Sequence, residues 1–141
     1  MVTKKNGFVE RWGKDAEDLP FEDSYYARVP GFIAMNYHQF RRAKPGDPKE
    51  GEVVGLSANE FTYMTLVMAF KFDVAGATAS PSDERMATLM GLSTKTIQRI
   101  KRSLKNKGAM TIRQDGSGRN NYVFDEVVRQ CRMIQETEGN F

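Results

Sequence analysis

Charges of a single sign fill the segment from Ser93 to Lys107, which carries six basic side chains and no acidic one. Basic side chains attract phosphates, and an arginine can also form two hydrogen bonds with guanine, as a glutamine does with adenine. The chemistry that this segment indicates is therefore binding to a polyanion. Considered by charge alone, a chance cluster on a solvated helix explains the segment equally well.

The excess positive charge is confined to this part of the chain. The 141 residues carry a net charge of +3, whereas residues 81–108 carry seven basic and two acidic side chains, giving +5. A localised basic patch of this kind is the electrostatic footprint of a polyanionic partner.

Apolar residues divide the predicted helix 94–107 into two faces. Ile97, Ile100 and Leu104 fall on one narrow arc at about 100° per residue. The opposite arc, with Gln98 at its edge, is formed by Lys95, Arg99, Arg102 and Asn106. The spacing therefore predicts a helix with a buried apolar side and an outward side that can contact bases.

Residues that flank this outward side are expected to contact phosphates. Lys101, Lys105 and Lys107 lie beside it, while Ser93 and Thr94 at the helix start can donate hydrogen bonds. The full set of expected DNA contacts is Ser93, Thr94, Lys95, Thr96, Gln98, Arg99, Lys101, Arg102, Lys105, Arg113, Arg119 and Asn120.

Two further helices are predicted before the basic one. The segment 56–72 is predicted to form a helix that opens with the Ser-x-x-Glu capping box of Ser57 and Glu60. It is apolar on most sides, so it should lie at the centre of the domain. A second helix is expected to be capped by Ser80, with Pro81 at its first position.

A tight turn joins the second and third helices. Gly91 ends the second helix and tolerates the positive φ that such a turn needs. Ser93 can cap the third helix, and Gly108 ends it. Ala87 is small enough to lie where the two helices cross. This pattern predicts a helix-turn-helix.

After Gly108 the periodicity changes from that of a helix to that of a strand. Residues 109–114 and 122–126 read as two strands around the glycine-containing turn 115–121, and residues 126–136 read as a final helix. Three helices and a hairpin predict a mainly α fold with a small β-hairpin, a winged helix-turn-helix. The wing tip carries Arg119 and Asn120, which either contact DNA or belong to a plain turn.

The chain resembles the winged helix-turn-helix domain of plasmid and phage replication initiators and related regulators. The resemblance covers about residues 54–124. It rests on Leu56-Ser57, Pro81-Ser82, Met86-Ala87, Gly91-Leu92-Ser93, Thr96 to Arg99 and Leu104 to Gly108. Met86 replaces the leucine or isoleucine common in the family. The resemblance implies binding to duplex DNA, often as a dimer, in replication or transcription control, without catalytic residues.

We expect three parts: an N-terminal arm and linker over 1–52, the winged helix-turn-helix over 53–126, and a C-terminal helix and tail over 127–141. The aromatic residues of the arm either pack on the core of the same chain or form a homodimer contact, together with the C-terminal helix. The expected function is sequence-specific binding of double-stranded DNA. The alternative is a protein-interaction module, or an architectural module that binds DNA without sequence preference.

Other classes of function find little support in the composition. One cysteine and one histidine cannot build the usual protein metal sites, and no recognisable catalytic arrangement occurs, so we expect no cofactor and no enzyme. The apolar runs are shorter than a membrane span, and no apolar leader follows Met1. A cytoplasmic protein is therefore expected, in keeping with the single cysteine.

Overall fold

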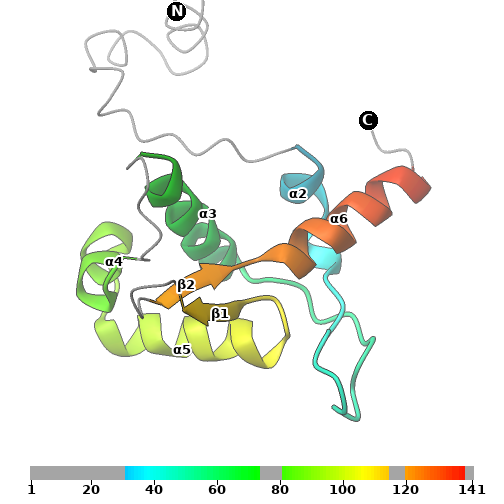
Figure 1. Ribbon diagram of the computed structural model, residues 1–141, viewed down its shortest axis with the longest axis horizontal. Coiled ribbons are helices and arrows are strands. Elements are labelled where there is room, and N and C mark those ends of the chain that lie inside the picture. Colours follow the sequence, from blue (N-terminus) through cyan, green and yellow to red (C-terminus); the bar gives the residue numbers. More distant parts are fainter. Residues whose placement is uncertain (1–30, 74–80, 115–119, 139–141) are drawn as a thin grey trace, which may run out of the picture.

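The computed structural model describes residues 31–73, 81–114 and 120–138 (Figure 1). This part of the chain is mainly helical and includes a two-stranded antiparallel sheet, as the sequence predicts. The elements are α2 (Gly31–Asn36), η3 (Tyr37–Gln39), α3 (Ala58–Asp73), α4 (Asp83–Met90), α5 (Thr94–Asn106), β1 (Thr111–Gln114), β2 (Asn120–Val123) and α6 (Asp125–Glu138).

The start of α3 confirms the predicted capping box. The amide of Ser57 donates to Glu60 Oε1 over 2.7 Å, and the amide of Glu60 donates to Ser57 Oγ over 3.1 Å. These two bonds satisfy backbone donors that the first turn of a helix leaves free. Further along α3, Tyr63 and Val67 are fully buried, which agrees with a central position for this helix.

The start of α4 corrects the predicted cap. The cap is Ser82, whose hydroxyl accepts from the amide of Arg85 over 3.2 Å, and not Ser80 followed by Pro81 at the first helical position. Capping by Ser82 places the carboxylates of Asp83 and Glu84 in the first turn, where the helix dipole favours negative charge.

The connection from α4 to α5 has the predicted turn chemistry. Gly91 adopts a left-handed conformation with φ of 67°, and the amide of Leu92 donates a hydrogen bond to the carbonyl of Ala87 over 3.0 Å. Ser93 then caps α5, because its hydroxyl accepts from the amide of Thr96 over 3.1 Å. α5 ends at Asn106, one residue before the predicted end.

The hairpin is present, but its second strand is placed differently from the prediction. β2 pairs with β1 from Asn120 to Val123, so Asn120 and Asn121 lie in the strand and not in the turn. The strand cannot continue to residue 126, because Asp125 begins α6. All four residues of β1 are exposed, including the apolar Ile112. In a sheet of two strands, both strands are edge strands.

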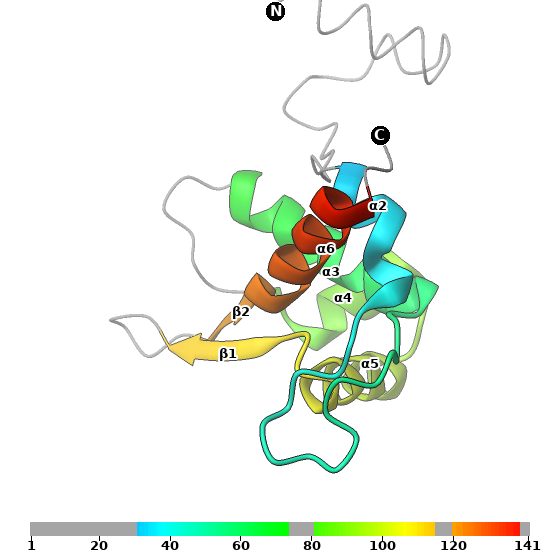
Figure 2. The same cartoon turned by 90° about the vertical axis from the view of Figure 1, so that its right-hand side faces the viewer.

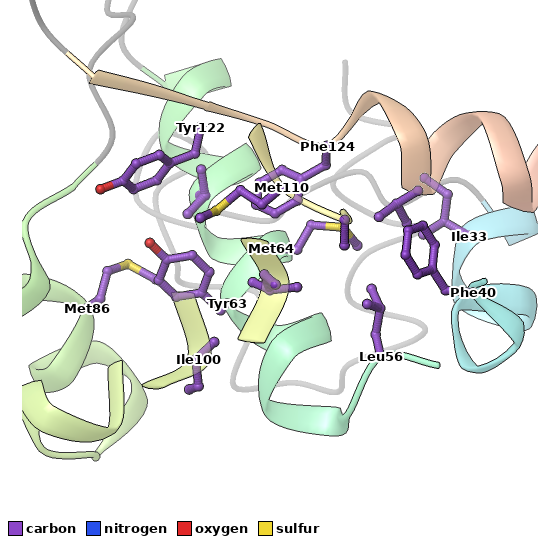
Figure 3. Close-up of a cluster of buried hydrophobic side chains, with 14 of the residues drawn as sticks. Ile33, Phe40, Leu56, Tyr63, Met64, Met86, Ile100, Met110, Tyr122 and Phe124 are labelled. Carbon is purple, nitrogen blue, oxygen red and sulfur yellow. The ribbon is translucent and has the colours of Figure 1, made fainter. Parts of the chain in front are cut away.

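Residues before the expected domain start join the main core. Ile33 and Phe40 belong to the same buried cluster as Val127 and Cys131 of α6, and Figure 3 shows Phe40 beside Leu56. α2 packs along α6, where Asn36 Nδ2 donates to Gln135 Oε1 over 3.1 Å. One buried cluster therefore contains residues on both sides of positions 52 and 127.

In the three described stretches, none of the helices has both the length and the apolar character needed to cross a lipid bilayer. The expected homodimer stays a prediction, and so does the arrangement of the aromatic arm, because residues 1–30 lie outside the described residues.

Candidate nucleic-acid interface

The two predicted faces of α5 are both present in the structure. Ile97, Ile100 and Leu104 are buried against the core. The exposed side chains of α5 are Thr94, Lys95, Gln98, Arg99, Arg102, Lys105 and Asn106. The helix therefore presents a polar and basic surface to solvent along its length.

Four cations on this surface have no internal partner. Lys95, Arg99, Arg102 and Lys105 form no ion pair or side-chain hydrogen bond with any other residue in the described ranges. We name these four side chains the basic face of α5. Their positive charge is therefore accessible to an anionic ligand.

Lys101 differs from these four, although the sequence groups it with the phosphate contacts. Its Nζ lies 2.8 Å from Asp83 Oδ1 and 5.1 Å from the ring centre of Tyr122. Partial burial acts to lower the pKa of Lys101, but the hydrogen bonds with Asp83 and Tyr122 outweigh it and raise the pKa. Lys101 thus holds α4 and β2 against α5.

Lys107 is also paired inside the fold. Its Nζ lies 2.6 Å from Oε1 of Glu60, a residue of α3 that is only 3% exposed. Burial acts to raise the pKa of Glu60, whereas hydrogen bonds from Lys107, Ser57 and Ser103 lower it, and the net pKa lies below the ordinary value of 4.5. The pair therefore joins the end of α5 to the start of α3.

The start of α5 uses two of its hydroxyl groups internally. The hydroxyl oxygens of Ser93 and Thr96 lie 2.9 Å apart, and Ser93 also accepts the capping bond from the Thr96 amide. Thr94 between them is exposed. Of the two hydroxyl residues expected at phosphates, Ser93 and Thr94, both are exposed, and the Ser93 hydroxyl also forms the helix cap.

Two of the predicted contacts lie on the hairpin, which is drawn next to α5 in Figure 1: Arg113 on β1 and Asn120 on β2. Arg113 on β1 is 66% exposed and lies 3.2 Å from Asp125 Oδ2, so its pairing is solvated and weak. Asn120 is exposed on β2, opposite Gln114. The predicted contact Arg119 lies outside the described residues, as does most of the turn 115–121.

The structure adds a neighbour of α5 that the sequence reasoning treated as a linker. In the 41–52 loop, Arg42 Nη1 donates to the carbonyl of Asn106 over 2.9 Å, and the amide of Ala43 donates to the carbonyl of Lys107 over 2.9 Å. The two prolines, two glycines and many charges of this stretch predicted a loop, but no local pattern predicted its contact with α5.

Comparisons with known protein families, with curated proteins and with solved structures found no match. Within the described ranges, no cluster of three or more histidine, cysteine, aspartate or glutamate residues could hold a metal ion. Burial raises the pKa of the Cys131 thiol to about 11, so the thiol stays protonated at neutral pH.

Proposed function

We propose that the chain is a winged helix-turn-helix protein that binds double-stranded DNA in a sequence-specific manner. α5 enters the major groove, and the hairpin of β1 and β2 lies on the adjacent backbone or in the minor groove. The observation that carries this proposal is the basic face of α5. Its four exposed cations have no partner among the described residues, and they lie beside two lysines that are paired within the fold.

The dimensions of α5 suit this role. Thirteen residues at 1.5 Å each make a helix of about 20 Å, and a B-DNA major groove about 12 Å wide admits an α-helix. Its apolar side is buried and its polar side is exposed, so the helix can enter a groove without losing its contacts with the core.

The exposed side chains of α5 divide by chemistry. Arg99 and Arg102 can each form two hydrogen bonds with guanine, and Gln98 can do so with adenine. Lys95 and Lys105 supply point charges for phosphates. This combination of base-reading and backbone-binding groups favours sequence-specific binding over purely electrostatic binding.

The biological setting that we propose is replication or transcription control of the plasmid or phage type. It is supported by the sequence resemblance of residues 54–124, in which the Gly91-Leu92-Ser93 turn and the Thr96-to-Arg99 segment occupy matching positions. Both settings use the same DNA-binding chemistry, and the position of the bound DNA fragment in the genome distinguishes them.

Fluorescence anisotropy in a salt series tests the proposal. The probes are random duplexes and duplexes from the genetic neighbourhood of the protein. We expect one fragment to bind most tightly, with a steep salt dependence, and Arg99→Ala to weaken that complex by about 1–3 kcal/mol and to relax the preference at one base pair. The matched control is Arg132→Ala, which removes one exposed cation from α6.

Two results would contradict the proposal. Equal affinity for every duplex would indicate an architectural module, and no binding at low salt would indicate a protein partner.

A further inference from the structure

The 41–52 loop is a braced hairpin and not a free connection. Arg41 and Val53 form an antiparallel bridge at its base. Above the bridge, the amide of Arg42 donates to the carbonyl of Glu52 over 2.8 Å, and the amide of Gly51 donates to the carbonyl of Arg42 over 2.9 Å. Because its backbone is already ordered, this loop would lose little conformational freedom on binding a ligand.

The loop is attached to the C-terminal end of α5. Besides the bonds from Arg42 and Ala43 described above, the two segments touch at Gly108, which has φ of 76°. A Cβ atom on Gly108 would lie 2.6 Å from the carbonyl carbon of Ala43, closer than real contacts allow. The loop and α5 therefore form one rigid surface.

The position of the loop extends the proposed DNA-binding side of the molecule. Figures 1 and 2 show α5 at one end of the molecule, and in both views the loop protrudes past α5 at that end. A duplex with α5 in its groove would run close to this protrusion, because the loop begins where α5 ends.

The charges on the loop suit a phosphate backbone. Lys44 and Lys49 are exposed and have no ion-pair partner in the described part of the chain. The carboxylate of Asp47 is paired within the loop: Oδ2 lies 4.0 Å from Arg42 Nη1, and Oδ1 accepts from the amide of Lys49 over 2.8 Å. Glu50 is exposed, and it also lines a pocket of about 470 Å³ between the loop and α6.

The third carboxylate, Glu52, is also exposed, near the base of the loop. It lies next to the bridge residue Val53, whereas Lys44 and Lys49 lie between the paired strands, toward the tip. The exposed charges toward the tip are therefore Lys44, Lys49 and one carboxylate, Glu50, so the cations outnumber the carboxylates there.

We propose that the 41–52 loop is a third DNA-contacting element, in which Lys44 and Lys49 bind backbone phosphates beside the groove that α5 occupies. This inference rests on the proposed function. It assigns to the loop a role in affinity and not in base recognition, because lysine on a phosphate carries no sequence information.

The test compares Lys44→Ala, Lys49→Ala and the double variant with wild-type protein and with the α6 control Arg132→Ala. Anisotropy is measured on the best fragment and on a random duplex across a salt series. Each single substitution is expected to reduce the slope of log K against log salt by about 1, and the double variant by about 2. The ratio of affinities for the two duplexes should stay constant, and Arg132→Ala should keep the wild-type slope.

The outcomes separate this inference from the proposed function. If wild-type protein binds with a steep slope and the double variant keeps that slope, the loop inference is wrong while the proposed function stands. A slope lost equally in Arg132→Ala would also overturn the loop inference, since the effect would then follow net charge. If wild-type protein binds no duplex at low salt, both proposals fail. Circular dichroism spectra of all variants verify that they are folded.

Discussion

The lysines of α5 divide into two groups according to their partners. Lys101 and Lys107 are paired with Asp83 and Glu60, so their charges hold other elements to α5. Lys95 and Lys105 have no such partners in the described residues and face solvent. One residue type in one helix thus has a structural role at two positions and a ligand-binding role, as we propose, at two others.

Lys101→Ala and Lys105→Ala should affect different properties. Lys101→Ala removes a partly exposed ion pair and a contact with Tyr122, so it should lower the free energy of unfolding by roughly 1 kcal/mol and leave the salt slope of DNA binding nearly unchanged. Lys105→Ala should reduce that slope by about 1 on every duplex and leave stability nearly unchanged. Urea unfolding and the anisotropy salt series measure the two effects. Equal slope losses in both variants would show that Lys101 also contacts DNA.

At the scale of elements, two glycines with positive φ position α5 at its two ends. Gly91 makes the turn from α4, and a Cβ there would meet no atom within 4 Å. Gly108 has a similar φ but packs on the backbone of Ala43. The turn before α5 is therefore a local backbone requirement, whereas the one after it also depends on the 41–52 loop.

Alanine at these two positions should give unequal losses of stability. Gly91→Ala should cost about 1–2 kcal/mol, the usual penalty of a left-handed conformation for a residue with a Cβ. Gly108→Ala should cost more, because the backbone of Ala43 must also move, and displacing the loop should lower the salt slope although no charge is lost. Urea unfolding of the two variants measures the difference. Equal losses of unfolding free energy in the two variants would mean that moving the 41–52 loop costs no measurable free energy.

At the scale of the whole molecule, the described elements share one core. Phe40, just after η3, is fully buried, and it lies in the same cluster as Val67 of α3, Leu104 of α5 and Val127 of α6. The segment before α3 and the last helix therefore stabilise the helices that carry the candidate interface, and they should unfold together with them.

Phe40→Ala tests this cooperativity. Removing a buried phenyl ring should lower the free energy of unfolding by about 3–5 kcal/mol, and unfolding should remain a single transition. Circular dichroism in urea, together with hydrogen exchange of α5 amides, measures this. A separate early transition of α2 and α6, with α5 amides still protected, would show that these two helices belong to an independent unit. The matched control is His38→Ala, since His38 is a nearby exposed residue.

Much of the fold follows from short-range signals in the sequence. The Ser57–Glu60 and Ser93–Thr96 caps, the left-handed Gly91 and the apolar spacing of α5 all depend on residues three or four positions apart, so a linear pattern contains them. The same spacing predicted which side of α5 is exposed. At the start of α4 the pattern favoured Ser80 as the cap, and this was wrong, since Ser82 caps the helix.

Only the tertiary structure decided which charges are available and what surrounds them. The partner of Lys101 lies 18 residues away, and the loop that supports the end of α5 bonds to it across 64 positions. No local pattern contains such pairings, because they depend on how whole elements pack. The sequence by itself therefore determined the helices α3 to α6, the turn between α4 and α5 and the outward side of α5, but not α2 and η3. Packing around the shared core determined that Lys101 and Lys107 are internal and that the 41–52 loop lies beside the candidate interface.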